Sequence, residues 1–383
     1  MCFISLYLHA IIFRFVNYKS GLLRMELSKE EQFTAINYVK AITIILVVAS
    51  HYPTSPINRL VPYMYHMPLF FFLGGMLFNH KKPLIEHYKK VLIKHFLYIV
   101  LTYVVVGCIA LVINKHTGSP VGAIFKDSIY NTVSNVLSTG FSNNRYFLAS
   151  WFLFAYFSLM LFAPFICRII YKMKNKTLAG IVFGLTIGWV GIYYTSVEYN
   201  QSKLILLNYI TQVLVGGMFF MIGFSTKHYI FKIMHNLSFS IIIILMILFY
   251  SNGIITWFGM SWSIYKLGYI NTVIGALMGI YCIFYISCTL SKAYKMSWLE
   301  YIGNGSKDIM SYHLVAFSIL NIFAWKLYDF DIKKNDILHS FSNEWSWVAY
   351  LLSGVAFPLI VTFIYSKYIE LYSNVFLKIK TPV

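Results

Sequence analysis

The chain has 383 residues, of which 59% are hydrophobic and only 11% charged, and its mean hydropathy is +0.67. Soluble domains carry about 25% charged residues, so this composition excludes a soluble protein and predicts an integral membrane protein. The 31 basic residues outnumber the 13 acidic ones, giving a formal net charge of +18. Such an excess suggests nucleic-acid binding in a soluble protein, whereas basic cytoplasmic loops explain it in a membrane protein without that partner.

Residues 1–33 are predicted to form a cytoplasmic N-terminal segment. The apolar stretch 3–13 is shorter than the about 20 residues that cross a bilayer, and no basic region precedes it as in a signal peptide. Met25 begins the polar run MELSKEEQ, which is typical of a soluble amino terminus. We therefore interpret Met25 as the initiator, so that residues 1–24 are not translated.

Apolar windows of spanning length then predict an all-α, polytopic membrane protein with about ten transmembrane helices in one bundle. The windows lie at 34–52, 61–79, 91–113, 147–167, 178–196, 204–224, 237–257, 268–290, 308–326 and 345–366. No long linker or repeat interrupts them. This predicts one transmembrane domain over 34–366 and a short basic cytoplasmic tail over 367–383.

Basic residues are distributed unevenly between the segments that connect these windows. If the amino terminus is cytoplasmic, most Lys and Arg residues fall in the inner segments, and five follow the second window: Lys81, Lys82, Lys89, Lys90 and Lys94. Cytoplasmic loops are enriched in such residues, so both termini are predicted to be cytoplasmic. The five cysteines form no Cys-x-x-Cys pair and lie mostly in apolar windows, which indicates buried thiols and no metal site.

Histidine is the expected catalytic base. All thirteen carboxylates lie outside the window centres, whereas four histidines lie within windows or at their edges: His51, His66, His95 and His313. An ionisable side chain in the membrane is costly and points to function. Histidine titrates close to neutral pH, which suits general acid–base catalysis.

His51 is the strongest candidate among these histidines. It follows Lys40 by about 16 Å of helix, which places it near the middle of a roughly 30 Å hydrocarbon core if Lys40 marks the inner surface. Pro53 should break or kink the helix there, and irregular backbone at that depth is tolerated only against protein or a water-filled cavity. The structural alternative is a histidine at a helix end that binds a loop carbonyl.

Two sequence runs carry a family pattern: NYVKAITIILVVASH, which ends at His51, and YHMPLFFFLGGMLF, which contains His66. They resemble the acyltransferase-3 family of membrane-bound O-acyltransferases, in particular its fucose 4-O-acetylase-like and enterobacterial-common-antigen O-acetyltransferase branch. Weaker similarity extends to SWFLFAYF at 150–157, to IGNGSKDIMSYH at 302–313 and to the basic run 87–94. The chain departs from the family pattern at five positions, namely Asn37 (often Asp), Ser50 (Gly), Gly74 (Ser), and Lys94 with His95 (Pro-Tyr).

The resemblance implies transfer of an acetyl group from acetyl-CoA, which acts as acyl donor and not as a tightly bound cofactor. The acceptor would be a sugar hydroxyl of a cell-surface polysaccharide or its lipid-linked precursor, and the location a bacterial inner membrane. His51 would be the general base, with direct transfer favoured over an acetyl-histidine relay, and His66 would orient donor or acceptor. The hydrogen-bond donor to the oxyanion would be Lys40, Ser50 or Tyr52, and the sequence does not distinguish between these three.

The resemblance and the charge pattern also suggest binding residues. Lys89 and Lys90, with Lys40, are predicted to bind the CoA phosphates, since Lys binds phosphate as a point charge; contact with anionic lipids is the alternative. Trp151 is predicted to contact the sugar, although an interfacial aromatic belt also explains it. His313 is the second predicted substrate-binding residue.

Three other functions compete with the acyltransferase. A transporter or flippase for lipid-linked sugars usually has interrupted helices in matching halves, whereas Pro53 marks a single interruption. A glycan polymerase would carry a larger outer loop, and a membrane scaffold would not need histidines in its spans. These considerations favour the enzyme.

Overall fold

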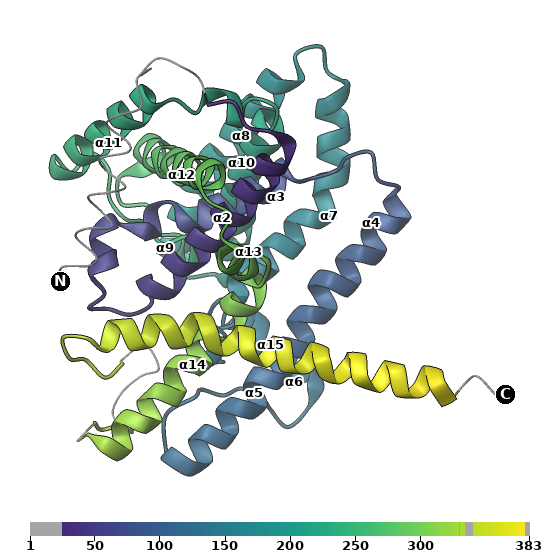
Figure 1. Ribbon diagram of the computed structural model, residues 1–383, viewed down its shortest axis with the longest axis vertical. Coiled ribbons are helices and arrows are strands. Elements are labelled where there is room, and N and C mark those ends of the chain that lie inside the picture. Colours follow the sequence, from purple (N-terminus) through teal and green to yellow (C-terminus); the bar gives the residue numbers. More distant parts are fainter. Residues whose placement is uncertain (1–24, 329, 334–339, 380–383) are drawn as a thin grey trace.

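The structure, a computed structural model, describes residues 25–328, 330–333 and 340–379. These residues form helices and include no β-strand, which confirms the predicted all-α membrane fold (Figure 1). Residues 1–24, on which the prediction of the initiator at Met25 depends, lie outside the described residues.

Each of the ten predicted windows overlaps a helix. The helices are α2 (Lys29–Ser50), α3 (His66–Met76), α5 (Tyr98–Thr117), α7 (Ser150–Lys172), α8 (Lys176–Val190), α10 (Ile205–Thr226), α11 (Asn236–Ser251), α12 (Gly268–Ala293), α14 (Ser306–Leu327) and α15 (Ser346–Ile379). In the described part of the chain, eight helices are long and apolar enough to cross a membrane. Helices α3 and α11 are shorter.

Shorter elements extend or connect these helices. A helix α4 (Leu84–Val91) and a π-helical turn η3 (Leu92–Leu97) lead into α5, while η5 (Gly191–Thr195) and α9 (Ser196–Ser202) continue α8. The connections contain α6 (Ile129–Ser138), α13 (Ser297–Asn304) and the 3₁₀ turns η1 (Pro56–Leu60), η2 (Pro62–Met64), η4 (Arg145–Phe147), η6 (Ile230–Ile233) and η7 (Met260–Trp262).

Helix α2 is the central helix of the bundle and packs against α3, α12, α13, α14 and α15 (Figure 1). It begins with a capping box, in which the Ser28 hydroxyl accepts from the Glu31 amide and the Glu31 carboxylate accepts from the Ser28 amide. It ends at Ser50, with His51 as its C-cap residue. Pro53 follows and cannot continue the helix, so the predicted interruption is present.

Helix α3 begins at His66, five residues later than the start of its predicted window. The chain between 56 and 64 forms two 3₁₀ turns joined at Val61, which has the left-handed φ of 51°. With 11 residues, α3 extends for about 16 Å, which is half the length of a spanning helix. Loop residues and short 3₁₀ turns therefore occupy the space next to the end of α2, where a longer α3 would lie.

Glycines allow α3 to pack closely against α10. A Cβ on Gly75 would lie 1.8 Å from the Phe220 carbonyl oxygen, and one on Gly223 would lie 2.0 Å from that of Phe72. Small residues commonly permit such approaches between membrane helices. Gly74, where the family pattern has Ser, faces the Tyr156 ring, and a Cβ there would lie 2.6 Å from it.

Helix α15 is a long rod against α14, and its C-terminal half projects beyond the bundle (Figure 1). It continues to Ile379, so most of the predicted tail is helical. Residues 367–379 contain neither Pro nor Gly. Their polar residues therefore end the apolar window without ending the helix.

Candidate active site

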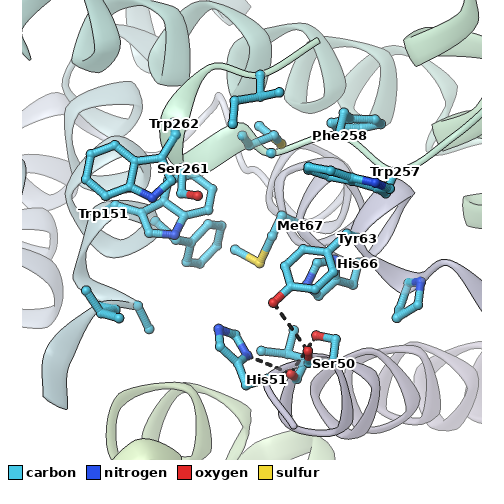
Figure 2. Close-up of a pocket in the computed structure, with 18 of the residues that line it drawn as sticks. Ser50, His51, Tyr63, His66, Met67, Trp151, Trp257, Phe258, Ser261 and Trp262 are labelled. Carbon is cyan, nitrogen blue, oxygen red and sulfur yellow. Dashed lines mark hydrogen bonds between the residues drawn. The ribbon is translucent and has the colours of Figure 1, made fainter. Parts of the chain in front are cut away.

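A cavity of about 670 Å³ opens between the ends of α2, α3 and α7 and the loop that precedes α12 (Figure 2). Its lining includes Ser50, His51, Asn58, Tyr63, His66, Met67, Trp151, Phe152, Trp257, Phe258, Ser261, Trp262 and Met310. His51, His66 and Trp151 lie at or near the ends of α2, α3 and α7 that are opposite the basic loops, whereas Met310 lies near the start of α14. Three residues predicted from the sequence, His51, His66 and Trp151, therefore line one cavity.

The ring of His51 lies at the floor of this cavity (Figure 2). Its Nδ1 atom lies 2.8 Å from the backbone oxygen of Val47. A carbonyl oxygen can only accept, so Nδ1 carries the proton and Nε2 presents its lone pair. Nε2 has no hydrogen-bond partner among the described residues. This tautomer is the one that a general base requires.

His313 lies beside His51 although 262 positions separate them in sequence. The ring centroids are 4.9 Å apart, and the rings meet at 61° in an edge-on arrangement. The Nδ1 atom of His313 donates to the backbone oxygens of Ile309 and Met310, at 3.0 and 2.9 Å. His313 is fully buried and its Nε2 has no partner in the described structure. The predicted substrate-binding residue thus contacts the predicted base.

His66 and Tyr63 complete the floor of the cavity. The Tyr63 ring lies edge-on to His66, with centroids 5.0 Å apart, and 6.1 Å from the His51 ring. His66 is buried, and its Nδ1 has no partner among the described residues. The Tyr63 hydroxyl donates to the Ser50 backbone oxygen over a long 3.4 Å.

Each predicted oxyanion donor already donates elsewhere. The Lys40 ammonium donates to the Asn37 side chain at 3.2 Å and the Ser50 hydroxyl to the Val47 backbone oxygen at 2.8 Å. The Tyr52 hydroxyl donates to the Phe341 backbone oxygen at 2.9 Å and lies 2.6 Å from a serine hydroxyl. The hydroxyl of Tyr63, which faces the cavity through a weaker bond, is better placed than these three. Its role was not predicted from the sequence.

Trp257 and Trp262 were also missed. They lie in the run WFGMSW between α11 and α12, and both indoles line the cavity together with Trp151 (Figure 2). Two tryptophans within six residues of the connection between α11 and α12 could have been recognised in the sequence as a candidate binding feature. Their position opposite α7 depends on long-range packing, which local patterns do not show.

The predicted CoA-binding lysines lie at the basic end, away from the cavity lining. Lys89 and Lys90 are exposed in the last turn of α4, and the π-helical turn η3 follows them directly. Such turns are frequent at functional sites. The cations of Lys90 and Lys94, and that of Lys307 from α14, lie within electrostatic range of the His95 ring.

Lys307 connects this basic end to the helix that carries His313. Its ammonium lies 3.3 Å from the centroid of the Tyr98 ring. The Tyr98 hydroxyl lies 3.0 Å from an Asp308 carboxylate oxygen and 2.9 Å from the Ser311 hydroxyl. The first turns of α14 thus carry polar groups of the basic end and, one turn later, His313.

A second basic cluster lies at the same end of the molecule. Burial lowers the pKa of His80, and the cations of Lys227, Lys81, Lys176 and Arg168 lower it further. The His80 ring lies tilted at 36° to the Tyr171 ring, with the ring centroids 3.9 Å apart. A neutral histidine among several cations leaves this surface strongly positive.

The family model described as an acyltransferase domain matches residues 33–367. No curated protein and no solved structure matches the chain. The matched range begins in α2 and ends in α15, so it includes every helix that lines the cavity.

Proposed function

This chain belongs to the acyltransferase-3 family and is a multi-pass membrane acyltransferase; we propose that it moves an acetyl group from acetyl-CoA to a sugar hydroxyl. The acceptor is a cell-surface polysaccharide or its lipid-linked precursor, and the membrane is the inner membrane of a bacterium with both termini in the cytoplasm. The observation that carries the proposal is the Nε2 atom of His51, which is unprotonated and faces an open cavity deep in the bundle.

His51 is the general base of the reaction. Its Nε2 takes the proton of the acceptor hydroxyl while the sugar oxygen bonds to the acetyl carbonyl carbon. The carbon–sulfur bond of the thioester then breaks, and the protonated His51 returns its proton to the CoA sulfur. The bond from Nδ1 to the Val47 oxygen holds the ring in the reactive tautomer throughout.

Tyr63 and His313 support this base. The Tyr63 hydroxyl gives up its long bond to Ser50 and donates to the developing oxyanion. His313 packs edge-on against His51 and positions the ring. His66, on the other side of Tyr63, orients the acceptor.

The depth of the site suits a donor that arrives from the cytoplasm. His313 lies seven residues from the start of α14 and fourteen from its end, or about 10 Å and about 21 Å along the helix. His51 itself lies at the far end of α2, whereas on α14 its neighbour His313 lies nearer to the basic end of the bundle. The phosphates of CoA bind Lys89 and Lys90 there, and Lys307 extends the positive surface toward α14.

The test uses membranes that contain the protein, radiolabelled acetyl-CoA and extracted surface glycan. Wild type and His116→Ala, which alters an exposed histidine at the end of α5, should label the glycan equally. His51→Ala should not. Equal labelling by His51→Ala would remove this residue from the mechanism. No labelling by wild type would favour a transporter, flippase or polymerase of lipid-linked glycans.

A further inference from the structure

We infer that the cavity binds an uncharged sugar unit on a rigid aromatic platform formed by Trp151, Trp257 and Trp262. The inference rests on the proposed function and specifies its acceptor. Three observations support it: the anchoring of the loop that carries Trp262, the faces of the indoles, and the chemistry of the polar atoms that remain free.

The loop that carries Trp262 is fixed on both sides of this residue. The backbone oxygen of Ser261 accepts from Gln212 at 2.7 Å and from Asn208 at 3.0 Å. The backbone oxygen of Ser263 accepts from Ser196 at 3.1 Å and from Asn200 at 3.0 Å. Two neighbouring carbonyls are thus bound by four side chains of α9 and α10.

Ser263 shows that this anchoring determines the backbone. It has the left-handed φ of 51°, it is fully buried, and its hydroxyl donates to Asn208 at 2.6 Å. A serine in this region is strained and persists only where its surroundings enforce it. The backbone bonds between Gly259 and Ile264, at 2.9 and 3.0 Å, close the loop. Trp262 is therefore held in place before any ligand binds.

All three indoles line the cavity and are partly exposed (Figure 2). The electron-rich face of an aromatic ring attracts weakly positive C–H groups. The face of a pyranose ring carries such groups, whereas its edge carries hydroxyls. A rigid indole can therefore bind a sugar face with little loss of side-chain entropy.

The cavity contains no charged side chain among its described lining residues. Among the described lining residues, the polar atoms without a protein partner include two acceptors, His51 Nε2 and the Asn58 side-chain oxygen, and the N–H donors of the three indoles. A sugar hydroxyl can donate to the acceptors and accept from the indoles, whereas a carboxylate or phosphate can only accept. A buried anion without a counter-charge is strongly unfavourable. The lining thus favours hydroxyl-rich, uncharged units over uronic acids, phosphosugars and nucleotide sugars.

Lys266 carries a cation near this site. The Lys266 ammonium lies 4.7 Å from the centroid of the Trp257 ring, and Lys266 does not line the cavity. It is engaged in a cation–π contact.

The test measures sugar binding and acetyl transfer separately on the full-length protein in lipid nanodiscs. The probes are neutral hexose and 6-deoxyhexose oligosaccharides, the hexose oligomers oxidised at C6 to carboxylates, and a nucleotide sugar. Binding is followed by tryptophan fluorescence without acetyl-CoA. At least one neutral oligosaccharide should bind, and the charged probes should bind about tenfold more weakly or not at all.

The variants identify the platform. Trp262→Ala should weaken neutral-sugar binding and raise the acceptor KM by about tenfold, with the acetyl-CoA KM unchanged. Trp262→Phe should retain most of the binding. Trp189→Ala is the matched control, because Trp189 on α8 has the same 41% exposure as Trp262 and lies outside the cavity. Gln212→Leu, which removes an anchor without touching the cavity lining, should show an intermediate loss.

The outcomes separate this inference from the proposed function. Neutral-sugar binding that depends on Trp262, without acetyl transfer, would support the sugar site and remove the proposed reaction. Acetyl transfer with equal use of the carboxylate probes, or an unchanged acceptor KM in Trp262→Ala, would overturn the inference and leave the reaction standing.

Discussion

His51 and His313 lie edge-on to each other with ring centroids 4.9 Å apart, and each donates its Nδ1 proton to a backbone oxygen of its own helix. Both rings therefore present unprotonated Nε2 atoms. Only His51 reaches the cavity, whereas His313 is fully buried behind it. The pair thus consists of one histidine placed to react and one placed to hold it.

Loss of the base should abolish most of the activity. We expect His51→Asn, which keeps a polar side chain at the helix end, to lower kcat by about 10²- to 10⁴-fold, the usual contribution of general acid–base catalysis. The melting temperature in detergent should stay close to that of wild type, because the side chain makes only one backbone hydrogen bond. A kcat within a factor of two of wild type would contradict the assignment.

The supporting histidine should act on turnover and not on binding. We expect His313→Phe, which keeps an aromatic ring against His51, to lower kcat by about 10²-fold through misplacement of the base. The KM values for acetyl-CoA and the glycan should not change. An increase in acceptor KM at unchanged kcat would instead make His313 a substrate-binding residue, as the sequence alone suggested.

The role of the Tyr63 hydroxyl as oxyanion donor can be tested with a variant that lacks only this hydroxyl group. Tyr63→Phe should lower kcat by about 10²- to 10³-fold, as expected for the loss of one oxyanion donor. Tyr52→Phe is the control, since its hydroxyl donates to the Phe341 backbone oxygen and should affect stability more than turnover. Steady-state kinetics and melting temperatures of the two variants, measured together, distinguish the two roles. Equal loss of kcat in both would exclude a specific role for Tyr63.

The predicted CoA site should respond to charge removal at chosen positions. We expect the double variant Lys89→Gln/Lys90→Gln to raise the KM for acetyl-CoA several-fold, with a weaker dependence on salt, because fewer cations face the phosphates. The matched control, Lys81→Gln/Lys176→Gln, removes two charges from the His80 cluster. If both pairs raise the KM equally, a general positive surface, and not a defined phosphate site, attracts the donor.

The contact between α3 and α10 should tolerate no added methyl group. Gly75→Ala would place a Cβ 1.8 Å from the Phe220 carbonyl oxygen, so we expect a destabilisation of about 1–3 kcal/mol from overpacking. Gly259→Ala is the control, because its Cβ would meet only ordinary contacts at 3.6 Å or more. Thermal unfolding in detergent measures both. Equal melting temperatures would show that the two helices can separate at little cost.

Much of this protein could be predicted from sequence because the signals are local. Twenty-residue apolar windows require helices in a membrane, since every backbone group must be paired there. The end of α2 near His51 follows from Pro53, and the short loop to His66 brings the two histidines near each other. The end of α15 was not predicted, because polar residues end the apolar window at residue 366 but do not interrupt the helix, which continues to Ile379.

The rest was decided by tertiary packing. No spacing rule places His313 beside His51, because the two are joined only through the packing of α14 against α2. The late start of α3 depends on a strained left-handed residue, Val61, which only its surroundings can stabilise. The position of Trp262 depends on side chains of α9 and α10 that bind two loop carbonyls. The sequence determined which residues could react, because hydrophobic composition and the proline that ends a helix are local features. The tertiary structure decided which of these residues lie next to each other, because that depends on contacts between helices that are distant in sequence.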